Sequence, residues 1–298
     1  MKSNLPGFIL FIVLVSILAS CEKTVDVKPL PYDSKLSIQC MLLPGTAPVL
    51  YLNNSVPYFD KKISNRDLFV RGALVTIATG SSIDTLRPDS LLNKVFCQFE
   101  YFYKGKMLTQ SGSTYSLKVL AGSKAFTSTT TTNQSKAAIT GVTYVSNFTD
   151  VYGEHEGVTV RFTDKPGEEN FYRYQLSRKI DNTVDYGESG IHSLCTNGEK
   201  FPIQEIGRAV YNDKNKDGLP MSFTAEPVYK HKANDTAYVL LQTMDRESAD
   251  FFDALDRQKL SAYNPFVEPV FLKTKIEGCI GVFGAYTVSD SVLFVYPE

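Results

Sequence analysis

The sequence contains no tryptophan and only three histidines, and its formal net charge at pH 7 is −1. The scarcity of histidine leaves few candidates for a general base or a metal ligand. The near balance of charge gives no indication of a nucleic-acid-binding surface or of a strongly acidic partner. None of the five cysteines has the close spacing of a zinc site or of a dense disulfide framework. These absences argue against a zinc protein and against a nucleic-acid-binding protein.

Long apolar stretches are missing except at the start of the chain. Residues 8–19 are predominantly apolar and follow Lys2, but the run is too short for a stable membrane-spanning helix and has the length of a signal-peptide core. Leu18-Ala19-Ser20-Cys21 resembles the lipobox of bacterial lipoproteins, in which the cysteine is acylated and becomes the first residue of the mature chain. We therefore predict a signal peptide over 1–20 and lipidation at Cys21. An ordinary secretory signal and a short membrane anchor are the alternatives.

The mature chain begins with a polar segment that proline interrupts, and we interpret residues 21–33 as a tether. Leu36, Ile38, Cys40 and Leu42 then alternate with other residues, and the same period of two recurs over 73–77, 95–101 and 115–119. Turn residues such as glycine and serine separate these segments. The pattern predicts a mainly β protein whose N-terminal domain, residues 34–135, is an immunoglobulin-like β-sandwich.

A threonine-rich segment over 127–132, followed by polar residues, marks the expected domain boundary. Alternation resumes over 139–145, 158–162 and 170–176, and an apolar run over 237–242 indicates a buried strand. Residues 136–298 are therefore predicted to form a second β-rich domain.

One segment departs from the β pattern. Ala249, Phe252 and Leu255 recur at helical spacing, and Asp245 or Thr243 is available as an N-cap. We expect one amphipathic helix over 245–258. Farther on, the glycines between 278 and 284 suggest that another backbone approaches the last strands closely.

Four cysteines remain once Cys21 carries lipid. Their wide spacing favours four buried free thiols, which behave as small hydrophobic residues. The alternative is two bridges, each within one domain, which an oxidising compartment permits. These bridges would join Cys40 to Cys97 and Cys195 to Cys279.

Calcium is the one candidate cofactor. Asp213, Asn215 and Asp217 are spaced as the first oxygen ligands of a calcium loop, and Gly218 supplies the sharp turn. The second half of that motif is absent, since Thr224 stands where a bidentate glutamate is required. An ordinary turn of Asn, Asp and Gly residues explains the same segment.

No nucleophile and base occur in a recognisable catalytic pattern, so a non-enzymatic function is predicted. His155 lies between two glutamates and could contribute to a metal site. Adjacent residues of a strand point to opposite faces, however, and we expect a solvated loop there.

Three segments of the second half resemble an uncharacterised family of Bacteroidota lipoproteins known as domain of unknown function 4249. They are Asp164-Lys165-Pro166-Gly167, Asn264-Pro265-Phe266 and Ile276-Glu277-Gly278, each with the residues that follow. The resemblance implies a lipoprotein of the outer membrane, on its periplasmic or cell-surface face, often encoded beside a TonB-dependent transporter. It implies no known activity and no catalytic residues.

The resulting hypothesis is a lipid-anchored binding protein that assists a TonB-dependent transporter in ligand capture or uptake. A surface adhesion or scaffold protein is one alternative. A calcium-assisted hydrolase that uses Asp213 and Asp217 is another.

Overall fold

The structure is a computed structural model that describes residues 32–57, 64–150, 153–180, 195, 199–229, 231–263, 266, 268, 270–272 and 274–298. The expected signal peptide, Cys21 and nearly all of the tether lie outside the described residues, as does most of the segment 264–270. No described helix is long and apolar enough to cross a membrane.

Strands make up most of the described secondary structure. The strands are β1 (Leu36–Leu42), β2 (Val49–Asn54), β3 (Leu74–Thr79), β4 (Ser82–Asn93), β5 (Gln98–Lys104), β6 (Thr114–Ala121), β7 (Lys124–Thr131), β8 (Ala138–Asp150), β9 (Gly153–Thr163), β10 (Phe171–Ile180), β11 (Phe201–Ile206), β12 (Tyr211–Asn212), β13 (Pro220–Ala225), β14 (Thr236–Met244), β15 (Ile280–Val288) and β16 (Val292–Val295), and the helices are α2 (Asn65–Leu68) and α3 (Arg246–Tyr263). The expectation of a mainly β protein is confirmed.

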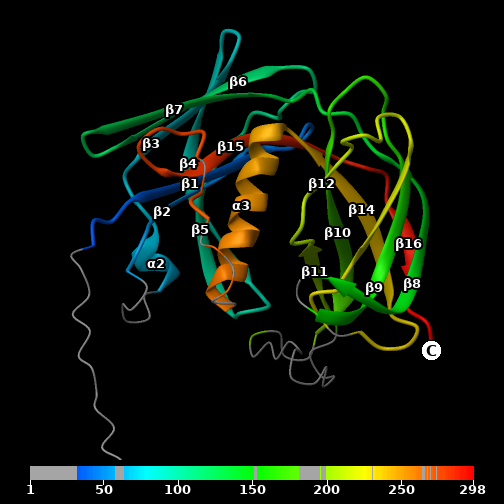
Figure 1. Ribbon diagram of the computed structural model, residues 1–298. Coiled ribbons are helices and arrows are strands. Elements are labelled where there is room, and N and C mark those ends of the chain that lie inside the picture. The colour runs from blue at the N-terminus through cyan, green and yellow to red at the C-terminus, as the bar shows by residue number, and fades with distance from the viewer. Residues whose placement is uncertain are drawn as a thin grey trace, which may run out of the picture.

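The first half of the chain forms a β-sandwich, as the sequence predicted (Figure 1). One layer contains β1, β2 and β5, and the other contains β3, β6 and β7. The long strand β4 belongs to both, because its first residues pair with β3 and its later residues pair with β5. Alternating side chains fill the space between the layers, with Ile38 and Leu52 on one side and Val75 on the other, all fully buried. Each such burial contributes about 1.5–3 kcal/mol to folding.

The second half repeats the two-layer arrangement. β10, β11, β14 and β16 form one layer, and the three-stranded sheet β13-β9-β8 covers it. Val160 and Phe162 of β9 meet Tyr172 and Leu176 of β10 in the shared core. The alternation seen in the sequence places these side chains on the inner faces.

Strand β15 joins the two halves. Its first residues pair in parallel with β1, from Ser37↔Ile280 to Leu42↔Ala285. Its last residues pair antiparallel with β14, from Met244↔Tyr286 to Gln242↔Val288. The predicted boundary after residue 135 falls between β7 and β8 in the chain, but a C-terminal strand completes the N-terminal sheet. The division into two domains stays a prediction.

The expected helix is present as α3 and extends beyond residue 258 to Tyr263. Asp245 caps it, since its Oδ1 accepts a hydrogen bond from the Ser248 N–H at 2.9 Å. Its Oδ2 also accepts from the Ala285 N–H of β15 at 2.6 Å, which ties the helix to the shared strand. Phe251 and Phe252 bury the inner face of the helix against Val282.

Two glycines of β15 make this packing feasible. A Cβ atom at Gly281 would collide with the backbone carbonyl of Ile38, and one at Gly284 would collide with the side chain of Ser248. The close backbone approach expected near 278–284 is therefore observed.

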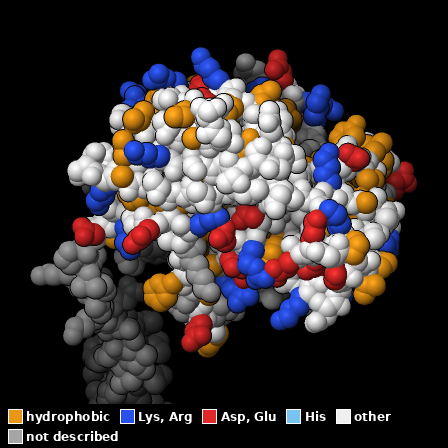
Figure 2. Space-filling model, turned by 90° about the horizontal axis from the view of Figure 1, so that it is seen from above, with side chains coloured by type: hydrophobic (Ala, Val, Ile, Leu, Met, Phe, Trp, Pro, Cys, Tyr) orange, Lys and Arg blue, Asp and Glu red, His pale blue; other side chains and the backbone are white. Residues whose placement is uncertain are grey.

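The surface carries no large patch of one charge on the face seen from above. Lys and Arg side chains alternate there with Asp and Glu side chains (Figure 2). This distribution agrees with the near balance of charge in the sequence.

Candidate functional site

The segment predicted to bind calcium forms a tight turn between β12 and β13. The Lys216 N–H donates to the Asp213 carbonyl at 2.6 Å, and Asn215 and Gly218 adopt left-handed backbone angles, with φ of 65° and 71°. Asparagine and glycine are the residues that accept this conformation most readily. Backbone geometry therefore explains the asparagine and the glycine of this turn, but not its two aspartates.

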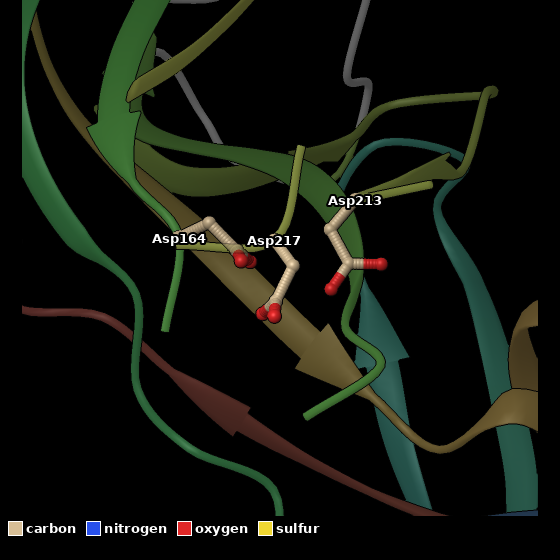
Figure 3. Close-up of side chains that lie close together, drawn as sticks. All are labelled: Asp164, Asp213 and Asp217. Atoms are coloured by element: carbon tan, nitrogen blue, oxygen red, sulfur yellow. The ribbon is translucent and has the colours of Figure 1, made fainter. Parts of the chain in front are cut away.

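A third carboxylate, Asp164, joins Asp213 and Asp217 from the end of β9 (Figure 3). One carboxylate oxygen from each residue lies within 4.8 Å of the other two. Asp164 and Asp213 are buried, whereas Asp217 is exposed. We call these three residues the acidic centre.

Sequence reasoning did not identify Asp164. β9 and β13 pair antiparallel up to Thr163↔Pro220, and the Asp164 N–H then donates to the Leu219 carbonyl at 3.2 Å. Asp164 is thus brought to the turn by strand pairing. The signal that could have revealed it is the pairing of a strand that ends at one glycine turn, with Gly167, and a strand that begins after another, with Gly218.

Hydrogen bonds already hold all three carboxylates. Asp164 accepts from the Tyr172 hydroxyl at 2.5 Å, from the Asn170 Nδ2 at 3.3 Å and from the Gly218 N–H at 2.7 Å. The Asn170 N–H donates to Asp213 at 3.0 Å, and the Gly167 N–H donates to Asp217 at 2.8 Å. The acidic centre therefore cross-links the turn at 166–167 to the turn at 213–218.

The surroundings of Asp213 disfavour the ionised form of its carboxyl group. Burial raises the pKa of Asp213, and the carboxylates of Asp164 and Glu169 raise it further against the effect of the Asn170 N–H. Burial and the bond to Asp164 also raise the pKa of Tyr172, which therefore donates as a neutral phenol. Such a set of oxygens suits a hard cation such as calcium.

An open cleft of about 720 Å³ adjoins the acidic centre. Its lining includes Asp213, Asn215 and Asp217, so it brings together the three residues that the sequence selected. Glu169 in the cleft is ion-paired with Arg246 at the start of α3. Carboxylates outnumber basic side chains in the lining, so the cleft favours cations over anions.

His155 does not lie in the solvated loop that was expected. It belongs to β9, with its Nε2 3.4 Å from Asp150 and its Nδ1 3.3 Å from Glu226. The expectation failed because β9 begins before His155, at Gly153. Asp150 and Glu226 also line a small cavity of about 260 Å³ with an apolar wall that includes Tyr211.

The cysteines follow neither alternative in full. A disulfide joins Cys97 to Cys195, with 5.6 Å between the Cα atoms, and Cys40 and Cys279 are buried free thiols. The predicted pairing of Cys40 with Cys97 and of Cys195 with Cys279 is wrong. Cys40 points into the first core, whereas Cys97 lies in the turn after β4 with a φ of 51° and so cannot reach it.

The two free thiols are chemically inert. Burial raises the pKa of Cys40 to about 12 and that of Cys279 to about 11. A thiol with so high a pKa contains almost no thiolate at neutral pH. The prediction of buried free thiols is correct for these two residues and wrong for Cys97 and Cys195.

The chain matches a protein-family model. The family model described as "Domain of unknown function (DUF4249)" matches residues 22–291, which is most of the chain. A search of the curated proteins found no match.

Proposed function

Because the chain belongs to the family described as a domain of unknown function (DUF4249), we propose its function from its chemistry. It is a lipid-anchored binding protein of the outer membrane that assists a TonB-dependent transporter in ligand capture or uptake. The lipobox-like Leu18-Ala19-Ser20-Cys21 supports the anchor. The transporter rests on the resemblance to Bacteroidota lipoproteins alone.

The observation that carries the proposal is the disulfide between Cys97 and Cys195. Disulfides form and persist in oxidising compartments, which include the bacterial periplasm and the cell surface. The bridge spans a sequence separation of 98 and therefore ties the end of the first sandwich to the second half of the chain. A folded region stabilised in this way suits a protein that works outside the cytoplasm.

Open clefts with fixed walls support a binding role. The cleft beside the acidic centre is bounded by carboxylates that backbone N–H groups already orient. Preorganised polar groups in a concave site are typical of ligand binding.

The proposal is tested with the protein purified from its own outer membrane in mild detergent through a C-terminal tag. We expect a single TonB-dependent transporter in stoichiometric amount, identified by mass spectrometry. Recovery of the lipoprotein alone would overturn the transporter assignment and favour adhesion.

A second experiment tests the anchor separately. The Cys21→Ser variant is expected to lose its acyl chains by intact mass and to leave the membrane fraction. The Cys279→Ser variant, which changes a buried thiol, is the matched control and is expected to stay membrane-bound. Equal membrane association of both variants would contradict lipidation at Cys21.

A further inference from the structure

A second cleft lies apart from the acidic centre, on the outer face of the first sandwich beside the short helix α2. Its volume is about 460 Å³. Its polar and aromatic lining comes from β1, β2, α2 and β5 and consists of Gln39, Tyr51, Asn53, Asn65, Glu100 and Tyr101. We call it the amide cleft.

The polar groups of the amide cleft are three amides, one carboxylate and the hydroxyls of two tyrosines. No Lys or Arg is among its described lining residues. Gln39 and Asn53 make no side-chain hydrogen bond with any described residue, so their donors and acceptors face the cleft unused. An amide presents both a donor and an acceptor in one plane, which matches a pair of neighbouring hydroxyl groups.

The remaining polar groups are fixed in place by one another. Glu100 Oε1 accepts a hydrogen bond from the Asn93 Nδ2 at 2.5 Å. Burial and the neighbouring Glu100 carboxylate raise the pKa of Tyr51, so its hydroxyl stays protonated. The Asn65 Nδ2 donates to the Phe99 carbonyl at 3.2 Å. A ligand would therefore meet a wall that is already ordered, which reduces the entropy lost on binding.

Aromatic rings form the rest of the wall. Tyr101 stacks on Phe69 with ring centroids 5.8 Å apart, and the ring of Tyr51 meets that of Phe102 edge-on at 5.8 Å. Phe99 lies next to Tyr101, with centroids 6.5 Å apart, and is 51% exposed. Phe69 and the Arg71 guanidinium, which lies 5.7 Å from the Tyr101 centroid, already contact the Tyr101 ring. Tyr51 is therefore the ring of the lining that offers an apolar surface beside the polar groups.

The chemistry of the cleft selects among ligand classes. A phosphate or a carboxylate would require Arg or Lys, and a polyvalent cation would require more than one carboxylate. A sugar ring has vicinal hydroxyls for the amides and an apolar C–H face for an aromatic ring. We propose that the amide cleft binds a neutral carbohydrate. This inference rests on the proposed binding function and names its ligand class.

The test uses the full chain on an array of neutral oligosaccharides, with heparin oligosaccharides as acidic probes. We expect neutral oligosaccharides to bind and acidic ones not to bind. The best neutral oligosaccharide is then titrated by calorimetry against Gln39→Ala and Tyr51→Ala. Each variant is expected to bind about tenfold more weakly, because each loses a polar contact or a stacking surface.

Matched controls lie on strands far from the cleft. Gln204→Ala removes an exposed glutamine of β11, and Tyr238→Ala removes a half-exposed tyrosine of β14, so both are expected to bind as the wild type does. Gln39 is itself exposed, so its variant folds even if Tyr51→Ala does not. Absence of binding to every neutral oligosaccharide, or equal binding by Gln39→Ala and Gln204→Ala, would overturn the inference.

The two proposals fail separately. Copurification of a transporter with Gln39→Ala, together with loss of glycan binding, would support both. Copurification of a transporter with a wild-type protein that binds no glycan would overturn only the proposal that the amide cleft binds carbohydrate. Glycan binding without a transporter would remove only the transporter assignment.

Discussion

Asp164 is the residue on which the two turns of the acidic centre depend. It is buried and accepts hydrogen bonds from Tyr172, Asn170 and Gly218. Removing this acceptor leaves the buried Tyr172 hydroxyl and the partly buried Gly218 N–H without it, whereas Asn170 also donates to two backbone carbonyls. Each donor that loses its partner costs about 1–3 kcal/mol. Its position thus matters for stability whether or not a ligand binds.

We expect Asp164→Ala to lower the free energy of unfolding by about 3 kcal/mol or more, measured by urea denaturation. Asp217→Ala is the control, because Asp217 is exposed and accepts a hydrogen bond from the Gly167 N–H. Its effect is expected to stay below about 1 kcal/mol. An equal decrease in the free energy of unfolding in the two variants would contradict a stabilising role for the buried carboxylate of Asp164.

Asp213 contributes a dependence of stability on pH. Its folded-state pKa is raised, so the folded protein binds this proton more readily than the unfolded chain does. Stability from this group is therefore fully present below the unfolded pKa and is lost as the pH rises through the folded value. We expect Asp213→Asn to unfold at a higher temperature than the wild type at pH 7 in chelator, and the difference to shrink toward pH 4.

Thermal unfolding at a series of pH values checks this sign. Asp217→Asn serves as the comparison, because that carboxyl is exposed. A difference between Asp213→Asn and the wild type that grows on acidification would contradict the prediction.

Calcium removal distinguishes the two explanations of the Asp213 turn. If the acidic centre holds calcium, the ion relieves the same repulsion, so millimolar calcium raises the unfolding temperature of the wild type by a few degrees. We expect no such rise in Asp213→Asn, and we expect a chelator to reverse the rise in the wild type. Identical unfolding of the wild type with calcium and with chelator would leave the turn as an ordinary structural feature.

At the scale of elements, β15 is the strand that makes the two sandwiches one structure. Gly281 lies against the Ile38 carbonyl in the parallel pairing with β1. Any side chain there must push β1 and β15 apart. The strand therefore tolerates substitution poorly at this position.

We expect Gly281→Ala to lower the free energy of unfolding by about 3 kcal/mol or to reduce the yield of folded protein. Gly141→Ala in β8 is the control, because open space surrounds that position and its backbone is not left-handed. Its effect is expected to be small. Comparable stability of the two variants in urea would mean that β1 and β15 are not as close as described.

Local patterns allowed most of these elements to be predicted. Alternation predicted the strands around Ile38, Val75 and Val160. Asp245 was one of the two residues expected as the helix cap, because capping involves residues a few positions apart. The predicted helix ended at residue 258, but the sequence has no stop signal there and the helix continues to Tyr263.

Contacts between distant segments could not be predicted in the same way. The approach of Asp164 to Asp213 depends on the register of β9 and β13, and the pairing of β1 with β15 crosses most of the chain. The Cys97–Cys195 bridge joins a turn of the first sandwich to a residue of the second half. Pairing the cysteines only within each predicted domain excluded this bridge. No local period encodes such contacts.

At the scale of the whole molecule, the disulfide makes a chemical prediction. Native protein treated with iodoacetamide is expected to remain unlabelled at Cys40 and Cys279, because both thiols are buried and have raised pKa values. After denaturation without reductant, both are expected to react, while Cys97 and Cys195 remain in one linked peptide. Peptide mapping by mass spectrometry reads out each site.

Reductant is the control for this experiment. Its addition to the denatured protein is expected to separate the linked peptide and to label Cys97 and Cys195 as well. Labelling of these two cysteines without reductant would contradict the bridge and would remove the main support for an extracytoplasmic protein.

The sharing of β15 also determines the order of events when the protein is made. β1 leaves the ribosome long before its parallel partner, residues 280–285, because strands β2 to β14 lie between them in the chain. Until then, one edge of β1 has no neighbour, and an open strand edge invites pairing with other chains. The first sandwich therefore cannot finish folding while the rest of the chain is still being synthesised or exported. The time during which this edge stays open is set by the length of the whole protein, so factors that shield nascent chains would matter more here than for a domain that closes its own sheet.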